Sequence, residues 1–260
     1  MNPKVSVIVP FHNDEIYFEK CMRSILDQSF KNLEIICVNN HSEDGSLAIA
    51  NFFSSISSRV YVFNSNSNNF FDSMNKAIIH SNGDFIVFIN PNSFLNKNYI
   101  EKFINQSISE DSDISFSKHH FFNHETQKID FDYLNHRNML LDRVKFDENY
   151  LGYGFHTCYN NFYKKEFLLE NNIQFKTDND FADLLFFYES YLSAKKWSIV
   201  YGDFCYHVFN DKCDNDFLDL KFYMQNNSDF PHILNSLEYV ADFFMDYDGF
   251  DSIIRKIIQE

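Results

Sequence analysis

The sequence lacks the features that mark membrane-spanning and secreted proteins. No apolar run approaches the roughly 18 unbroken residues that a membrane span needs. The N-terminus, MNPKVSVIVP, has neither the long apolar region nor the small-residue cleavage site of a signal peptide. The five cysteines are odd in number and show no CxxC spacing, which indicates reduced thiols rather than disulfides or zinc. We therefore expect a cytoplasmic protein.

Positive charge is also scarce. The chain has 22 Lys and Arg residues against 37 Asp and Glu, a net charge of -15. Because binding to a nucleic-acid backbone needs a basic face, we do not expect nucleic acid as a partner. The sequence contains neither a GxGxxG motif nor a P-loop lysine motif. This argues against a dinucleotide-binding fold of the usual kind and against a P-loop NTPase.

What the sequence does contain is a regular alternation of apolar patterns in its first ninety residues. Continuous, largely β-branched or aromatic runs predict strands at Val5–Val9, Leu33–Val38, Val60–Phe63 and Phe85–Ile89. Apolar residues at helical spacing lie between them. Strands and helices that alternate in this way predict an α/β fold with a doubly wound, mostly parallel sheet.

Polar residues follow three of these predicted strands. They are Pro10-Phe11-His12-Asn13, Asn39-Asn40-His41-Ser42 and Asn90-Pro91-Asn92. In doubly wound sheets, ligands bind beyond the carboxyl ends of the strands. The three loops are therefore the first indication of a binding site.

Several separated blocks resemble the family 2 glycosyltransferases of the GT-A fold. They are KVSVIVPFHN, SILDQSFKNLEIICVNNHSEDGS and GDFIVFINPNSF, within residues 4–95, and the resemblance continues more weakly to about residue 208. It implies a Rossmann-like, GT-A type sheet with a nucleotide-sugar-binding half, residues 1–95, and an acceptor-binding half, residues 96–212. The apolar pattern of residues 213–260 predicts a C-terminal helical appendage.

The resemblance also implies roles for individual residues. Donor-binding positions would be Pro10, His12, Asn13, Asn40, Asn90 and Asn92. Asp183 would be the general base, although an acid in the first turn of a helix also simply favours the helix dipole. His207 would contact phosphate or metal, but a lone histidine is also common as a hydrogen-bonded wall residue.

The chain departs from the family pattern where acids usually stand. Asn39 and Asn40 replace two acids after the second strand, and Asn90 and Asn92 replace the Asp-x-Asp metal motif. A neutral amide is a poor anchor for Mg²⁺ or Mn²⁺. We therefore expect weak or no divalent metal and assign no residue as a metal ligand, and we expect a UDP-sugar as the co-substrate. Three further positions depart from the pattern, Asn69, Met74 and Ala182, where the family usually has Gly, Arg and Glu.

Two function hypotheses follow from these residues. The first is an inverting glycosyltransferase that moves a sugar from a nucleotide-sugar to a glycan or lipid-linked acceptor, in synthesis of a bacterial lipopolysaccharide, capsule or glycoprotein. It would work in the cytoplasm or at the inner membrane face. The second is an inactive GT-A pseudoenzyme that binds nucleotide or a partner glycosyltransferase, or assembles with copies of itself. The acid at position 183 favours the first, and the paired loss of acids favours the second.

Overall fold

The structure, a computed structural model, describes residues 3–65, 69–117, 120–123, 128–130, 157–177, 182–200 and 205–209. All of these residues belong to one compact unit, which is formed by Met1–Asp130 and Thr157–Phe209. The predicted helical appendage at 213–260 lies outside the described residues and remains a prediction. Within the described ranges, no helix is both long and apolar enough to cross a membrane.

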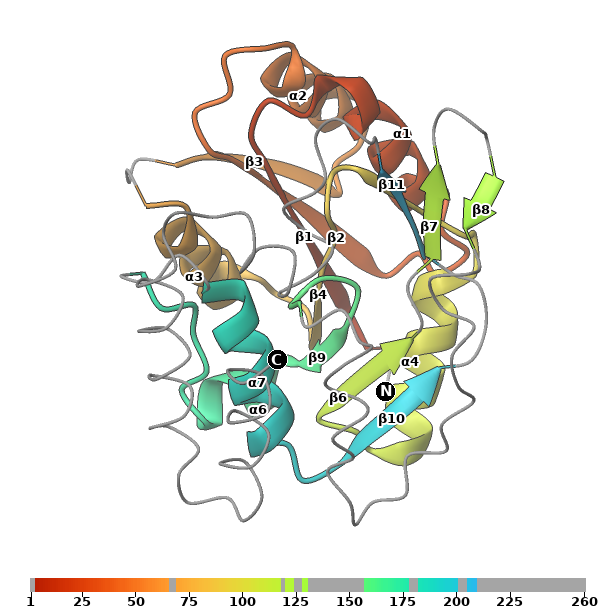
Figure 1. Ribbon diagram of the computed structural model, residues 1–260, viewed down its shortest axis with the longest axis vertical. Helices are drawn as coiled ribbons and strands as arrows, with labels where there is room; N and C mark the ends of the chain where they lie inside the picture. The colour runs from red at the N-terminus through yellow and green to blue at the C-terminus, as the bar shows by residue number, and fades with distance from the viewer. Residues whose placement is uncertain are drawn as a thin grey trace, which may run out of the picture. The chain divides into compact units, whose positions relative to one another are not determined.

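The first ninety residues alternate strands and helices as the sequence predicts (Figure 1). The elements are β1 (Val5–Phe11), α1 (Glu15–Leu26), β2 (Leu33–Asn39), α2 (Ser46–Ile56), β3 (Val60–Asn64), α3 (Phe70–His80) and β4 (Phe85–Phe88). β1, β2, β3 and β4 are parallel neighbours, with β1 between β2 and β4. Each of the four predicted strands is therefore present.

The remainder of the unit extends this sheet and adds a second, smaller one. The further elements are β5 (Ser93–Leu95), α4 (Tyr99–Glu110), β6 (Ile114–Ser117), β7 (His120–Asn123), β8 (Lys128–Asp130), β9 (Phe162–Lys164), α6 (Lys165–Glu170), α7 (Ala182–Ser193), β10 (Trp197–Val200) and β11 (Cys205–Phe209). The main sheet has the order β10-β6-β9-β4-β1-β2-β3, and β9 is its antiparallel strand. β5, β11, β7 and β8 form the second sheet. The predicted α/β class with a mostly parallel, doubly wound sheet is confirmed.

Helices cover both faces of the main sheet, which explains why the central strands β1, β2 and β4 are buried along their whole length. Val5, Val7 and Val9 of β1 belong to the core cluster that includes residues of α1, α2 and α4. Ile8, between them, belongs to the cluster that includes residues of α3, α6 and α7. Figure 1 shows α3, α6 and α7 gathered together, apart from α1 and α2.

A buried carboxylate ties the starts of the central strands together. Glu34 of β2 is 2% exposed and accepts hydrogen bonds from Lys4 Nζ at 2.7 Å and Ser6 Oγ at 2.6 Å. Ser6 Oγ also accepts the Gly83 N–H at 2.8 Å. Burial alone would raise the pKa of Glu34, but the hydrogen bonds from Lys4, Ser6 and Asn82 outweigh it and lower the pKa to about 2. This network fixes β4 beside β1 from the end opposite the polar loops.

Candidate functional site

The ends of β1, β2 and β4 meet at one edge of the main sheet. The Asn40 N–H donates to the carbonyl of Phe11 at 2.9 Å, so β2 and β1 end together. The Ile89 N–H donates to the carbonyl of Ile8 at 2.9 Å, which places the end of β4 on the other side of β1. We call the residues that follow these strands the rim: His12–Asp14, Asn40–Ser42 and Asn90–Asn92. The structure thus brings the three predicted loops to one edge.

The loops after β1 and β2 are joined by side-chain hydrogen bonds. His12 Nδ1 lies 2.6 Å from the carbonyl oxygen of Asn40, and His12 Nε2 lies 3.3 Å from Asn13 Nδ2. A carbonyl only accepts and an amide nitrogen only donates, so these contacts fit the His12 tautomer with its proton on Nδ1. Asn13 Oδ1 in turn accepts the Glu43 N–H at 2.8 Å. His12 and Asn13 therefore hold the second loop in place.

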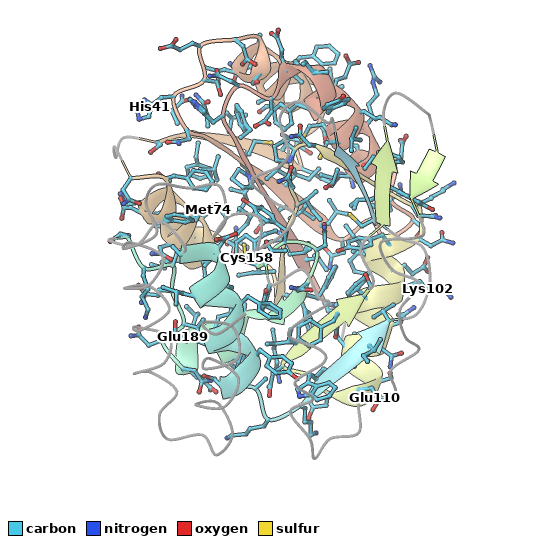
Figure 2. The ribbon with its side chains drawn as sticks, viewed as in Figure 1. His41, Met74, Lys102, Glu110, Cys158 and Glu189 are labelled. Atoms are coloured by element: carbon cyan, nitrogen blue, oxygen red, sulfur yellow. The ribbon has the colours of Figure 1, made fainter. Side chains whose placement is uncertain are left out.

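Two of the predicted donor-binding residues, Asn13 and Pro10, are limited in what they can offer a ligand, Asn13 by its hydrogen bonds and Pro10 by its burial. Asn13 has a left-handed backbone, φ 57°, a conformation that asparagine tolerates better than most residues. Its side-chain oxygen is already engaged with the loop after β2. Pro10 is buried within β1. His41, which sequence reasoning did not single out, is exposed in the loop after β2, also with a left-handed backbone at φ 56° (Figure 2).

The neighbouring amides after β2 have different surroundings. Asn39 is 5% exposed; its Nδ2 donates to Asn64 Oδ1 at 3.0 Å and its Oδ1 accepts the Ser42 N–H at 3.1 Å. Both ends of the Asn39 amide thus stabilise the fold. Asn40 is half-buried, and its side chain makes no hydrogen bond to any described residue. Within the described part of the chain, the Asn40 amide is available to a ligand.

The Asn90-Pro91-Asn92 turn closes on itself. Asn90 Oδ1 accepts the Asn92 N–H at 2.9 Å, and the carbonyl of Asn92 accepts the Val208 N–H at 2.8 Å. Pro91 is buried, whereas Asn90 and Asn92 are half-buried. The Asn92 side chain makes no hydrogen bond with the described residues. A ligand at this turn can therefore contact the Asn92 side-chain amide and the side-chain NH2 (Nδ2) of Asn90.

These groups do not fit a divalent metal held by the protein. The turn offers one uncommitted amide oxygen, that of Asn92, because the oxygen of Asn90 accepts a backbone N–H. The described ranges contain no group of three or more His, Cys, Asp or Glu residues placed to hold a metal. Mg²⁺ and Mn²⁺ favour carboxylate oxygens. The chemistry of this donor set therefore disfavours a resident ion.

The helix ends near the rim are capped by side chains of the protein itself. Asp44 accepts the N–H groups of Glu15, at 3.1 Å, and Ser46, at 2.9 Å, at the starts of α1 and α2. Asn69 Oδ1 accepts the Phe71 N–H at 2.9 Å at the start of α3. Helix N-termini often bind phosphate. Here the capped N–H groups are already satisfied, which removes part of that binding capacity.

Two described lysines, Lys164 and Lys76, are paired with carboxylates of the protein. Lys164 is paired with Phe85 at the start of β4, the edge away from the rim, and forms an ion pair with Asp111 at 3.6 Å. Lys76 forms an ion pair with Asp72 at 2.7 Å on an exposed part of α3. Each ammonium group is thus already paired with a carboxylate.

Asp183 lies in the first turn of α7 and is half-buried. Burial raises the pKa of the Tyr159 phenol well above its usual value, and the charges of Cys158, Asp183 and Asp14 raise it further. Tyr159 bridges to Phe88, the last residue of β4. Figure 2 shows the neighbouring Cys158 between α7 and the strands. The charges of Asp183 and Asp14 thus both reach Tyr159, whose backbone lies beside the end of β4.

Tyr159 is a further site candidate, which the sequence analysis did not single out. The backbone of His207 is placed in β11 opposite Ser93, one residue from the bond between Val208 and the Asn92 carbonyl. Its contact with phosphate or metal remains a prediction.

The remaining departures from the family pattern have structural roles. Met74 is 1% exposed and belongs to the core cluster of α3, α6 and α7 (Figure 2). Ala182 is fully buried in the same cluster. Asn69 caps α3. None of these positions brings a charge toward the rim, in agreement with the neutral amides at Asn40 and Asn92.

Comparison with known proteins identifies the family. The model of Glycosyl transferase family 2 matches residues 6–170. Glycosyltransferase GlyA of Streptococcus pneumoniae is 27% identical over 151 residues, 57% of this chain and 22% of GlyA. Poly(ribitol-phosphate) beta-glucosyltransferase of Bacillus spizizenii is 30% identical over 203 residues, 75% of this chain and 31% of that protein. The chain spans about a fifth to two fifths of the length of the first curated relatives.

Solved structures share the fold. S. aureus TarS 1-349 in complex with UDP-GlcNAc has a TM-score of 0.64 at 21% identity, covering 80% of this chain and 59% of TarS 1-349. Mannosyltransferase PcManGT from Pyrobaculum calidifontis, in complex with GDP-Man and Mn²⁺, has a TM-score of 0.60 at 15% identity, covering 82% of this chain and 59% of that one. The predicted GT-A type fold is confirmed.

Proposed function

This chain belongs to glycosyl transferase family 2, and from that membership we propose that it transfers a sugar from a nucleotide-sugar donor to an acceptor hydroxyl. One observation carries the proposal. The uncommitted amides of Asn40 and Asn92 lie at the same sheet edge, and the charge of Asp183 reaches Tyr159, which bridges to the last residue of the strand that leads to Asn92. Ligands of doubly wound sheets bind at this edge.

The donor is a UDP-sugar in this proposal. The half-buried Asn40 amide can accept a hydrogen bond from uracil N3–H, since an amide offers both an acceptor and a donor. His12 and Asn13 fix the loop that carries Asn40. The crystallised complex of TarS with UDP-GlcNAc supports a uridine donor by fold similarity. The Asn92 side-chain amide and the Asn90 side-chain NH2 are then the partners for ribose or phosphate.

Asp183 is the general base in this proposal. An inverting transfer needs one carboxylate to take the proton of the acceptor hydroxyl during in-line displacement at the sugar. Asp183 is half-buried at the start of α7.

The transfer takes place with little or no contribution from a protein-held metal. The amides at positions 90 and 92 supply no charge, and Lys76 and Lys164 are each paired with a carboxylate of the protein. The relatives' names support an acceptor in bacterial surface glycan synthesis, such as the poly(ribitol-phosphate) of the Bacillus spizizenii enzyme. We propose a glycan or lipid-linked acceptor, and transfer in the cytoplasm or at the inner membrane face.

The test is turnover of a panel of donors. UDP release from UDP-GlcNAc, UDP-glucose and UDP-galactose is measured for the parent and for Asp183→Asn, with EDTA and with Mn²⁺. We expect the parent to hydrolyse at least one donor and Asp183→Asn to be slower by about 10²-fold, as for loss of a general base. UDP affinity and melting temperature should change little. An Asp183→Asn variant as active as the parent would remove the role of Asp183.

The amides and the capped helix ends also favour a second function. A pseudoenzyme that binds nucleotide or a partner protein needs neither a metal motif nor a free phosphate site. The same panel separates the two: UDP binding without turnover of any donor supports the pseudoenzyme.

A further inference from the structure

We propose that Asn75 is a positioning residue that sets the location of Asp183, an inference that rests on the proposed function of Asp183 as the base. Asn75 lies on α3 and Asp183 on α7. The segment that joins them structurally, Ile173–Thr177, precedes α7 in the chain and has no helix or strand of its own.

Asn75 supplies the hydrogen bonds that a neighbouring strand would otherwise give to this segment. Its Oδ1 accepts the Phe175 N–H at 2.8 Å, and its Nδ2 donates to the Phe175 carbonyl at 2.8 Å. Phe175 is 2% exposed, so its backbone groups need partners within the protein. Both bonds come from one side chain, and together they fix the position and orientation of the Phe175 backbone relative to α3.

The ring of Phe175 passes this constraint to α7. It stacks on the ring of Phe186 with centroids 4.2 Å apart and an angle of 12°. Both rings meet Phe88 edge-on, at 5.4 Å and 5.5 Å. Phe88 ends β4, two residues before Asn90. A close-packed cluster of this kind has few alternative arrangements, so a shift of Phe175 moves Phe186.

Phe186 and Asp183 are three residues apart on the same helix and therefore neighbours on one face. Two weaker ties support the same segment: Asn69 Nδ2 donates to the Thr177 carbonyl, and Lys176 forms an ion pair with Glu189 of α7 at 3.2 Å. Neither reaches Phe175. The bonds of Asn75 thus set the ring that locates the first turn of α7, and with it the carboxylate of Asp183.

A displaced base changes turnover but not donor binding. A misplacement of about 1 Å can cost about 10²-fold in rate. Asn75→Ala should therefore lower kcat for UDP-sugar hydrolysis by about 10-fold or more, with KM for the same donor within about twofold of the parent.

The matched control is Gln28→Ala. Gln28 is a buried amide that, like the half-buried Asn75, holds backbone groups: Nε2 donates to the Ser24 carbonyl at 3.0 Å and to the Asn96 carbonyl at 2.8 Å, and Oε1 accepts the Ile100 N–H at 3.0 Å. It ties α1 to the start of α4, in the other helical layer. The control should lower the melting temperature at least as much as Asn75→Ala and leave kcat within about twofold.

The decisive measurement is a double-mutant cycle with Asp183→Asn, on the donor that the parent hydrolyses. If Asn75 acts through Asp183, the double variant is no slower than Asp183→Asn alone. Losses that multiply in the double variant would overturn the proposal. So would an equal loss of kcat in Gln28→Ala, since that indicates general destabilisation.

Hydrogen exchange separates this proposal from the proposed function. In Asn75→Ala, the amides of α7 should exchange roughly tenfold faster than in the parent, and those of α7 in Gln28→Ala should not. If the parent hydrolyses no donor but α7 responds in this way, the proposed activity fails and the clamp on α7 stands. Unchanged exchange in Asn75→Ala overturns the clamp whatever the activity.

Discussion

Replacing the buried carboxylate of Glu34 should destabilise the protein in a way that depends on pH. The side chain is 3% exposed and accepts hydrogen bonds from Lys4, Ser6 and both nitrogens of Asn82. These bonds lower its pKa from 4.5 to about 2 against the opposing effect of burial. Each pH unit of lowering corresponds to about 1.4 kcal/mol, so the charged form contributes on the order of 3 kcal/mol.

The sign follows from the direction of the shift. A carboxyl whose pKa is lowered on folding stabilises the protein fully above its unfolded pKa near 4.5. The contribution is then lost as the pH falls toward the folded pKa of about 2. Roughly two fifths of it should be lost by pH 3.5. Glu34→Gln removes the charge and keeps the shape.

Urea titrations followed by circular dichroism at pH 7 and pH 3.5 test this. At pH 7, the free energy of unfolding of Glu34→Gln should be about 2–3 kcal/mol lower than that of the parent. This difference should narrow at pH 3.5. The control is Glu19→Gln, an exposed partner of Arg23 at 2.6 Å, which should cost less than about 0.5 kcal/mol at either pH. A difference between parent and Glu34→Gln that is the same at both pH values would refute the reasoning.

Two further variants test the close approach at Gly83 and the neutral amides at the rim. Gly83→Ala should lower the free energy of unfolding by about 2 kcal/mol or more in the same urea titration, because an added Cβ would lie 2.5 Å from Ser6 Oγ and 2.6 Å from Ser6 N. An unchanged urea midpoint would show that the starts of β1 and β4 can move apart freely. Asn90→Asp combined with Asn92→Asp should raise Mn²⁺ affinity by about 10-fold or more in the presence of UDP, as calorimetry can measure, since carboxylates replace neutral oxygens. A parent that binds Mn²⁺ with UDP as tightly as this double variant would contradict the interpretation of the amides.

Much of the fold could be predicted because the strands are apolar on both faces. The runs beginning at Val5, Leu33, Val60 and Phe85 marked the four parallel strands, and the polar residues after three of them marked the rim. β9 could not be predicted in the same way. It is only three residues long, Phe162–Lys164, and joins the sheet between β4 and β6 through long-range pairing. Its direction is what carries Lys164 to the edge away from the rim.

The sequence could show which amides stand where acids were expected, but not which amides are available. Asn39 and Asn40 are adjacent and chemically identical, yet one is consumed by Asn64 and Ser42 and the other is not. That difference depends on β3 and on the loop geometry. The capping of α1 and α2 by Asp44 is likewise a consequence of two loops meeting in space.

The central claim is that the rim binds the nucleotide through Asn40 without a metal of its own. Calorimetric titration with UDP tests this claim most directly. The parent should bind UDP in EDTA, with a Kd within a few-fold of that in Mn²⁺. Asn40→Ala should weaken binding by about 10-fold, the cost of a lost hydrogen bond to a buried base. Asn39→Ala, which removes an amide that stabilises the fold, is the control and should weaken UDP binding less than Asn40→Ala does. A folded parent that binds no UDP in either buffer, or an Asn40→Ala variant that binds as tightly as the parent, would contradict the account.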